Sequence, residues 1–234
     1  ESQKLFQIVL NSISHELRTP ISVITTAVSA MDDEKTASNP VFRREICKEL
    51  NTASMRLNIL VENILDMSRI ESGYLSLNLQ LYEVDDLMGT ILNELSDEPY
   101  KQVIKLTVDE QLPMVRIDIN WFKQAIINVL RNAIMYTPPD SVIDIHVFRT
   151  TDKQVAIEIS DNGPGIPEDA VKKIFDKFYR VPGSKSGGSG LGLTITKAIV
   201  EAHSGQIFAE NKQDGGLRFL ILLTSIQSDA GQQV

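Results

Sequence analysis

A histidine in the segment SISHELRTP is placed where it could carry chemistry. His15 follows the apolar residue Ile13 by two positions, which on an α-helix turns it about 200° away from Ile13 and toward water. An exposed imidazole has a pKa near ~6.5, is largely neutral at pH 7 and can attack an electrophilic phosphorus. Glu16 can hold the second ring nitrogen or accept its proton. His15 alone would also fit an ordinary surface histidine.

A proline follows this histidine within the same predicted helix. Pro20 removes the amide that would bond the Glu16 carbonyl, a defect that costs about 3 kcal/mol in an ordinary helix. The sequence therefore predicts a bend one turn beyond His15, with a role in motion or access. A tolerated kink in a helical bundle is the alternative.

A second group of polar residues repeats every four positions in NWFKQAIINVLRNAIMYTPP. Asn128, Asn132 and Tyr136 form one stripe on a predicted helix that is otherwise apolar. Buried amides need partners, and carboxamide oxygens suit a Mg²⁺ ion that keeps most of its water and its substrate phosphates. An amphipathic surface helix would give the same stripe.

The segment ISDNGPGIP indicates a binding site at the end of a strand. The strand delivers Asp161, and Gly163 and Gly165 allow the backbone to pass close to a planar ligand. A carboxylate accepts from an exocyclic amine and repels a carbonyl, so it would select adenine over guanine. A simple Asp-Gly turn is the alternative.

A glycine-rich loop leads into a helix predicted to start near Leu191, whose first amides favour phosphate. Gly188, Gly190 and Gly192 do not match the dinucleotide fingerprint, and the loop has no Gly-Lys-Ser/Thr of a P-loop. Positive charge gathers just upstream, although some of it will simply be solvated. The residues concerned are Lys172, Lys173, Lys177, Arg180 and Lys185.

Two long helices must position His15. Residues 1–72 read as a helical hairpin whose second helix carries a heptad seam, with a loop from Asp32 to Pro40. Two helices cannot cover both of their apolar stripes, so two chains are expected to pair as a homodimeric four-helix bundle. The seam of the second helix is Ile46, Leu50, Ala53, Leu57, Leu60, Ile64 and Met67.

The pattern changes after Gly73, so a hinge is expected between Glu71 and Leu77, and a second domain over residues 77–228. Helices are predicted over 84–96 and 120–136, with Asn120 as the N-cap of the latter. Strands are predicted over 104–108, 142–148 and 155–160, with a final pair turning at DGG. The fold class is therefore α+β, a helical hairpin followed by an α/β sandwich.

Charge and composition limit the classes of partner, metal site and membrane segment that the chain can have. Lysine plus arginine number 23 and aspartate plus glutamate 31, and the net charge of −8 disfavours nucleic acid and bare membrane surfaces as partners. The single cysteine, Cys47, and three histidines make a disulfide or zinc site improbable, and fit a reducing compartment. His146 and His203 are predicted to be structural. The longest uncharged stretch is too short to span a bilayer, so a membrane anchor could exist only outside these residues.

Taken in order, SHELRTP, NVLRNAIMYTP, DNGPGIP, IFDKFYRV and GSGLGL resemble the transmitter region of bacterial sensor histidine kinases over nearly the whole chain. The resemblance implies a dimerisation and phosphoacceptor hairpin and an ATP-binding domain of the type shared with gyrase, Hsp90 and MutL. The spacing around DMSRIESG and YTPPDS looks most like the KdpD-type potassium sensors. A cytoplasmic location, as part of a membrane-anchored sensor, would follow.

The resemblance also implies residue roles. His15 would be phosphorylated with Glu16 as its base or orienter, Thr19 would help to orient water for dephosphorylating a response regulator, and Arg180 would reach the γ-phosphate. Asn132 would bind Mg²⁺ with Asn128 assisting, and Tyr136 would stack near adenine. The remaining nucleotide-binding residues would be Asp161, Gly163 and Gly165 at adenine, Lys177 at the phosphates, and Gly188, Gly190, Leu191 and Gly192 in a lid.

Two positions depart from related patterns. Met135 stands where the family commonly has lysine, so a phosphate contact would be missing, which would either weaken nucleotide binding or shift the contact to Lys177 or Lys185. Asn128 stands where ATP-hydrolysing relatives carry a water-activating glutamate, so bound ATP should survive to meet the histidine. The expected function is autophosphorylation on His15 with transfer to a response-regulator aspartate. An ATPase driving conformational change and a nucleotide-sensing scaffold are the rival hypotheses.

Overall fold

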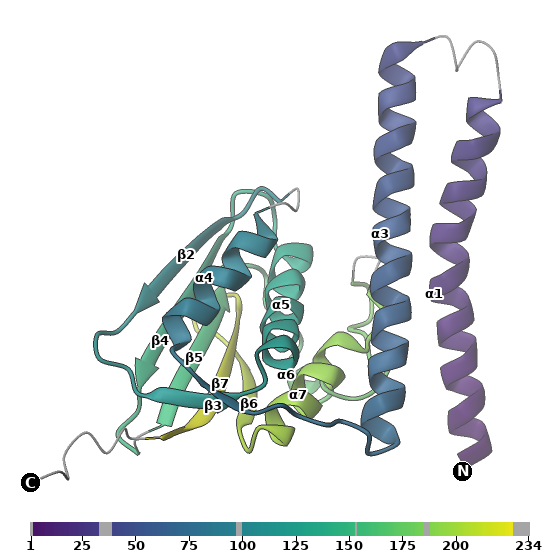
Figure 1. Cartoon of the computed structure of the whole chain (residues 1–234). Helices are drawn as coiled ribbons and strands as arrows, with labels where there is room; N and C mark the ends of the chain where they lie inside the picture. Colours follow the sequence, from purple (N-terminus) through teal and green to yellow (C-terminus); the bar gives the residue numbers. More distant parts are fainter. Residues whose placement is uncertain (1, 33–38, 97–99, 153, 185–187, 227–234) are drawn as a thin grey trace, which may run out of the picture.

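The computed structural model describes residues 2–32, 39–96, 100–152, 154–184 and 188–226, with side chains from residue 13 to residue 225. Most of the predicted loop from Asp32 to Pro40, Lys185 and the predicted domain end at residue 228 lie outside the described residues. A helical hairpin stands beside a mixed α/β domain, which confirms the predicted fold class (Figure 1).

The hairpin consists of α1 (Ser2–Met31) and α3 (Pro40–Glu71). Asn39 begins α3, because its Oδ1 accepts hydrogen bonds from the amides of Val41 at 3.0 Å and Phe42 at 3.4 Å. Pro40 occupies the first turn, where its missing amide costs nothing. The helix stops just before Gly73, as the sequence predicted.

The heptad seam of α3 is buried at every second member, Ile46, Ala53, Leu60 and Met67. On α1, Pro20 is buried inside a helix that continues past it to Met31. Ile21 and Val28 are apolar residues of α1 that remain 49% and 50% exposed. One chain therefore covers only part of the apolar surface of its hairpin.

The second domain is built on a sheet with the strand order β1-β3-β7-β5-β4-β2, with β6 also paired to β7. All neighbours are antiparallel except β2 and β4. The strands are β1 (Gln80–Tyr82), β2 (Val103–Val108), β3 (Met114–Ile117), β4 (Val142–Arg149), β5 (Gln154–Asp161), β6 (Gln206–Asn211) and β7 (Leu217–Ile226).

Helices α4 (Val84–Leu95), α5 (Ile119–Tyr136) and α7 (Gly192–Ala202) bury their apolar faces against this sheet, and α6 (Glu168–Val171) is a short additional turn. Alternation places Ile143, Ile145 and Val147 of β4 in the core, where they meet Phe122, Ile126 and Leu130 of α5. This core fixes the end of β5 beside the C-terminal half of α5.

One sequence prediction needs correction, and two strands were missed. The N-cap of α5 is Asp118 rather than Asn120, because Asp118 Oδ1 accepts from the amides of Asn120 at 3.0 Å and Trp121 at 3.3 Å. The strands β1 and β3 were not predicted, since β1 has only three residues and gives no periodic signal.

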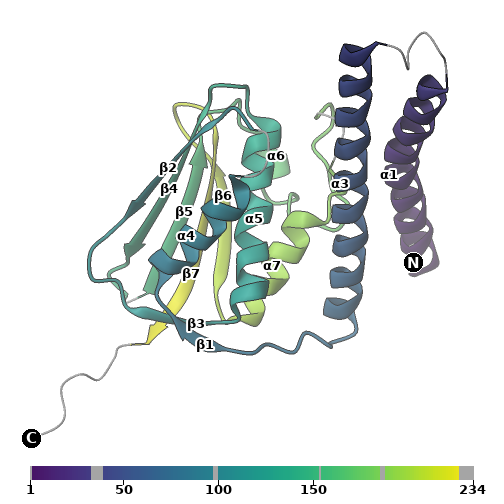
Figure 2. The ribbon, with the colours of Figure 1, turned by 45° about the horizontal axis from the view of Figure 1, so that its top comes forward.

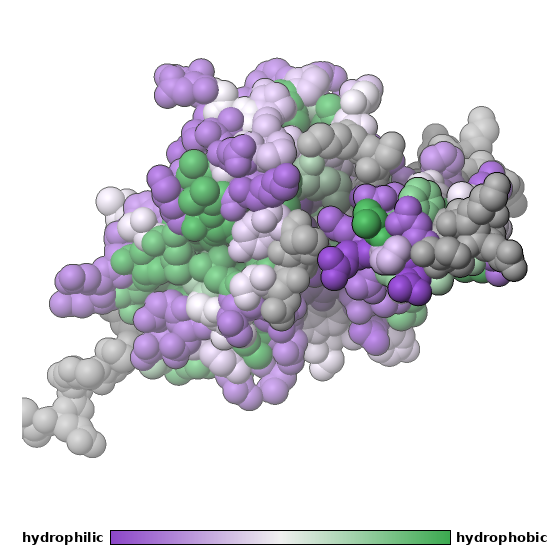
Figure 3. Space-filling model, turned by 90° about the horizontal axis from the view of Figure 1, so that it is seen from above, coloured by the Kyte–Doolittle hydropathy of each residue, from purple (hydrophilic) through white to green (hydrophobic). Residues whose placement is uncertain are grey.

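Helices α5 and α7 lie between the sheet and α3, so the helical layer of the mixed domain faces the hairpin (Figures 1 and 2). Seen from above, the surface is largely hydrophilic, and its broadest hydrophobic area lies on the mixed domain (Figure 3). Among the described residues, no helix combines the length and apolarity that a membrane crossing needs.

Candidate active site

A cavity of about 1140 Å³ lies between the hairpin and the mixed domain. Residues from both sides line it, so the hairpin histidine and the predicted nucleotide residues share one space. The sequence-predicted residues that line it are His15, Glu16, Thr19, Asn128, Asn132, Tyr136, Asp161, Gly165, Arg180, Gly188, Gly190 and Gly192.

His15 is exposed on α1, as its spacing from Ile13 predicted. Thr19, one turn further along, donates its hydroxyl to the His15 carbonyl at 3.3 Å. The Glu16 carboxylate is mostly buried, with 16% of its side chain exposed, and accepts from Arg180 Nη1 at 2.8 Å. His15 therefore lies next to a carboxylate that is already paired with an arginine of the other domain.

The amide stripe of α5 faces the cavity. Asn128 is buried and donates from Nδ2 to the carbonyl of Gly192 at 3.3 Å, which ties α5 to the start of α7. Asn132 and Tyr136 are half-buried and line the cavity one and two turns later. Met135 lines it as well.

Asp161 ends β5 as a buried carboxylate. Its Oδ1 accepts from the amides of Gly163 at 2.8 Å and Leu217 at 3.3 Å. Burial raises the pKa of Asp161, while these two amide hydrogen bonds and the charge of Lys212 oppose that rise. The fixed carboxylate lines the cavity as an acceptor for a donor on a planar ligand.

The segment after Asp161 passes close to its neighbours. A side chain at Gly163 would meet Asp161 Oδ1 and Thr137 Cγ2 at 2.9 Å. A side chain at Gly165 would lie 2.8 Å from Asn211 Oδ1. Asn211 holds this segment through both amide atoms, because Oδ1 accepts from the Ile166 amide at 3.0 Å and Nδ2 donates to the Ile166 carbonyl at 2.8 Å. No pattern in the sequence singled out Asn211.

The described part of the glycine-rich loop packs on residues 178–180, which have the sequence FYR. Gly190 has a φ of +67°, and a Cβ there would lie 2.7 Å from the backbone of Phe178, so only glycine fits. Its carbonyl accepts from the Phe178 amide at 3.0 Å. Leu191, next in sequence, is buried rather than part of the cavity wall.

The cations are distributed differently from the prediction. Arg180 lines the cavity, whereas Lys177 lies outside its lining and donates to Glu71 at 2.5 Å. Lys172 and Lys173 are exposed and also do not line it. Three cations that the sequence did not single out do line it: Lys48 and Arg56 from α3, and Arg131 from α5.

The described residues contain no cluster of three or more His, Cys, Asp or Glu side chains that could hold a metal ion. The amide oxygens on the α5 wall of the cavity belong to Asn128 and Asn132, and they suit a Mg²⁺ ion that arrives with a phosphate-bearing ligand. The donor chemistry therefore fits the predicted magnesium contact.

The other two histidines have partners of their own. His146 Nε2 lies 3.0 Å from Asp109 on the surface. His203 is buried at the end of α7, where Nδ1 lies 2.7 Å from the Ile199 carbonyl and Nε2 accepts from the Asp118 amide at 3.0 Å. Burial lowers the pKa of His203, and the ring is held as the neutral form.

Two family models match successive parts of the chain. Residues 7–73 match the His Kinase A (phospho-acceptor) domain. Residues 117–226 match the histidine kinase-, DNA gyrase B-, and HSP90-like ATPase family. The first match contains His15 and the second contains the amide stripe, Asp161 and the glycine-rich loop.

Curated relatives match along almost the whole chain. The sensor protein KdpD of Clostridium acetobutylicum is 35% identical over 94% of this chain and 25% of its own length. The sensor protein RprX of Bacteroides fragilis is 31% identical over 94% of this chain and 44% of its own length. The chain thus spans less than half the length of these relatives.

Solved structures share the fold. The histidine kinase AdeS of Acinetobacter baumannii has a TM-score of 0.68 at 25% identity, covering 91% of this chain and 98% of that chain. The histidine kinase ThkA, solved in complex with the response regulator TrrA, has a TM-score of 0.69 at 23% identity, covering 97% of this chain and 64% of that chain. With both family models matched in order and sensor kinases aligned along it, the chain belongs to the sensor histidine kinases, of which it forms a transmitter region.

Proposed function

We propose that this chain transfers the γ-phosphoryl group of MgATP to His15 and then to an aspartate of a response regulator. The observation that carries the proposal is the shared cavity: His15 and Glu16 line the same space as Asn132, Tyr136 and Asp161. Proximity of an acceptor and a bound donor converts transfer into a unimolecular step.

The chemical step needs a neutral imidazole. A ring nitrogen of His15 attacks the γ-phosphorus, the N–P bond forms, and the P–O bond to the β-phosphate breaks with its electron pair leaving on ADP. The proton on the other ring nitrogen passes to Glu16. Arg180, already bonded to Glu16, can at the same time neutralise the transferring phosphoryl oxygens.

The nucleotide would be held by the α5 wall and the end of β5. The Asp161 carboxylate accepts from the adenine amine, and Tyr136 packs near the ring. Asn132 would hold Mg²⁺ with Asn128 assisting, and the described glycines Gly188, Gly190 and Gly192, which line the cavity, would border the phosphates.

Further cations could contact the phosphates besides the predicted Lys177 and Lys185. Lys177 is engaged with Glu71, and Lys185 lies outside the described residues. Arg131, Arg180 and the α3 cations Lys48 and Arg56 line the cavity, so these side chains would supply positive charge to the phosphates.

The proposed domains are a phosphoacceptor hairpin over residues 1–72 and a catalytic domain over 77–228.

Thr19 supports a second activity, dephosphorylation of the regulator. Its hydroxyl donates to the His15 carbonyl, and it lines the same cavity, where it can orient water. The proposed site of action is the cytoplasm, since ATP and the regulator are found there. The assignment of this chain to the KdpD-type subgroup stays a prediction.

Labelling with γ-³²P-ATP tests the proposal. The chain should acquire a label that is labile in acid and stable in base, and His15→Gln should abolish it. Free phosphate without protein label would support the rival ATPase. Nucleotide binding without either product would support the rival scaffold.

A homodimer is part of the proposal. The residues left exposed on α1 and α3 include Ile21, Val28, Val61 and Leu65, each between 44% and 52% exposed. They repeat along both helices at helical spacing, and a second hairpin would cover them as a four-helix bundle.

A further inference from the structure

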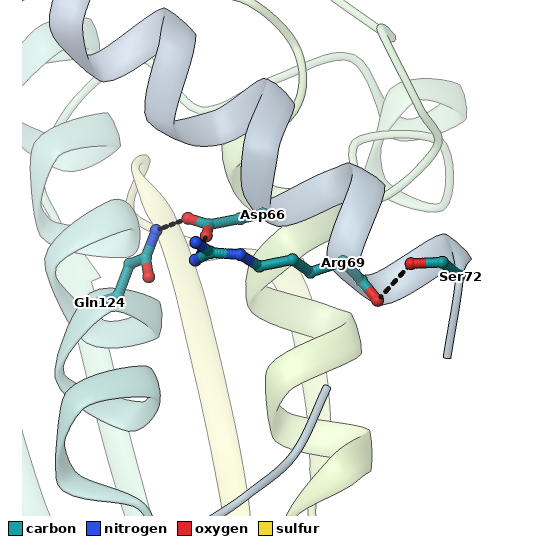
Figure 4. A network of polar contacts seen from close by, with 4 residues as sticks. All are labelled: Asp66, Arg69, Ser72 and Gln124. Carbon is teal, nitrogen blue, oxygen red and sulfur yellow. Dashed lines mark hydrogen bonds and ion pairs between the residues drawn. The ribbon is translucent and has the colours of Figure 1, made fainter. Parts of the chain in front are cut away.

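Polar contacts between described residues dock the catalytic domain on the hairpin of its own chain, and three of them carry the argument. Arg180 bonds Glu16 of α1 at 2.8 Å, and Lys177 bonds Glu71 at the end of α3 at 2.5 Å. The third contact joins α5 to α3, where Gln124 Nε2 donates to Asp66 Oδ2 at 2.5 Å (Figure 4). Asp66 is buried by this docking and accepts from Arg69 as well, at 3.3 Å.

An apolar cluster supports these contacts. Met67 of α3 packs with Ala125 of α5 and with Leu191, Ile195 and Ile199 at the start and along the length of α7. Ile64 and Ile70 of α3 and Trp121 and Phe178 of the catalytic domain border the same cluster. Met67 is only 8% exposed, so the docked arrangement removes an apolar surface of α3 from water.

The connection between the two domains is short and anchored. The α3 helix ends at Glu71, and the Asn78 amide already donates to Asp118 Oδ2 of the catalytic domain at 2.9 Å. The residues between can span at most about 25 Å when fully extended. The catalytic domain is therefore kept beside the end of its own hairpin.

We propose that autophosphorylation occurs in cis: a chain transfers the phosphoryl group from its bound nucleotide to its own His15. This inference rests on the proposed function. Its basis is that Arg180, which borders the nucleotide cavity, is bonded to Glu16 next to His15 of the same chain. Transfer in trans would require this pair to form with Glu16 of a second copy.

Mixed dimers distinguish the two routes. A tagged wild-type chain is co-expressed with an untagged Asp161→Asn chain, which keeps His15 but lacks the adenine acceptor, and the heterodimer is purified through the tag. After incubation with γ-³²P-ATP, we expect label on the wild-type chain in an excess of about tenfold or more, equivalent to about 1.4 kcal/mol in favour of own-chain transfer. Predominant label on the Asp161→Asn chain would overturn the proposal.

A second pairing removes dependence on one variant. A heterodimer of His15→Gln with Asn132→Ala has one intact nucleotide site and one intact acceptor on different chains, so transfer in cis predicts no label and transfer in trans predicts a labelled Asn132→Ala chain. The wild-type homodimer is run alongside. If it is unlabelled, the proposed function itself fails, which is a different result from label on the wrong chain.

Discussion

At the scale of a single residue, two requirements on the Asp161 carboxylate oppose each other. Its burial disfavours the charged form, whereas its proposed role in nucleotide binding needs the charge. Burial raises its pKa, so the charged form destabilises the folded protein at pH 7. For a carboxyl group with a raised folded pKa, the contribution to stability is full below the unfolded value of 3.8 and is lost as pH rises through the folded value. The same charge is what an adenine amine would recognise.

We expect Asp161→Asn to keep or raise the melting temperature at pH 7 while weakening ATP binding. The Asn oxygen can still accept from the amides of Gly163 and Leu217, whereas its NH₂ group would oppose the adenine amine. Loss of a hydrogen bond to a charged group costs about 1.5–3 kcal/mol, or about 10- to 100-fold in Kd. Thermal unfolding and calorimetric titration with ATP measure the two effects, and a fall in melting temperature with unchanged affinity would contradict the assignment.

Asn211 is a positioning residue for the segment that follows Asp161. Its amide bonds both the amide and the carbonyl of Ile166, so Asn211→Ala leaves two backbone groups without these partners. At about 1 kcal/mol each, we expect ATP affinity to fall by about 5- to 30-fold with little change in the labelling rate at saturating ATP. Asn162→Ala is the control, because Asn162 bonds the Val142 amide instead. Equal affinity in both variants would refute this role.

The residues that the sequence could identify are those that interrupt a pattern. His15 stands off an apolar stripe, Asn128 and Asn132 interrupt an apolar helix, and Asp161 closes a strand before glycines. Asn211 sits on a short alternating strand beside ordinary turn residues, and its partner is 45 positions away in sequence. Only the fold brings that pair together, so no local rule could find it.

At the scale of secondary-structure elements, the contact between the end of α7 and the start of α5 is expected to make the stability of the fold depend on pH. Burial lowers the pKa of His203, whose ring joins the end of α7 to Asp118 at the start of α5. A base whose folded pKa is lowered stabilises the protein fully above its unfolded value of 6.5, and this contribution is lost as pH falls below it. Asp118, the charged group facing the ring, acts in the opposite direction without cancelling the shift.

We therefore expect the urea midpoint to fall between pH 7.5 and 5, and the fall to be smaller in His203→Gln. The Gln oxygen can accept from the Asp118 amide at every pH in this range, although the substitution itself will lower stability at pH 7.5. His146→Gln is the control, because that histidine is on the surface beside Asp109. The assignment is wrong if the two variants show the same pH profile as the wild-type chain.

The α3 helix has a second buried face that its heptad pattern did not separate from the seam. Met67 was predicted as a seam residue, and the structure packs it against α5 and α7. Met67→Ala should weaken docking of the catalytic domain by about 2 kcal/mol, and the labelling rate should fall by up to about 30-fold with the KM for ATP unchanged.

Met55 provides the matched control for this docking face. It lies on the same helix but is 45% exposed, so Met55→Ala should leave the docking of the catalytic domain intact. Single-turnover labelling over a range of ATP concentrations separates rate from affinity. A raised KM in Met67→Ala with an unchanged maximal rate would show that this face supports the nucleotide site rather than docking.

At the scale of the whole molecule, the sequence predicted the hairpin and the mixed domain, but not how they dock. Asn63 and Asp66 are polar residues that become buried on α3. A local pattern assigns such residues to the solvent face, because their partners, such as Gln124, lie in another domain. Ile21 and Val28 show the reverse case. They are apolar residues, for which a local pattern predicts burial, yet a single chain leaves them exposed.

That mismatch leads to a prediction about assembly. If a second hairpin covers the exposed stripe, a charge placed in it must be desolvated on association, which costs several kcal/mol. Val28→Glu and Leu65→Glu should each convert the dimer to monomer at micromolar concentration, as measured by sedimentation equilibrium. Ser29→Glu, at an exposed polar position on α1, should not. If all three variants sediment as the wild-type chain does, the exposed stripe is not the dimer interface. If transfer occurs in cis, the monomeric variants should still become labelled on their own His15.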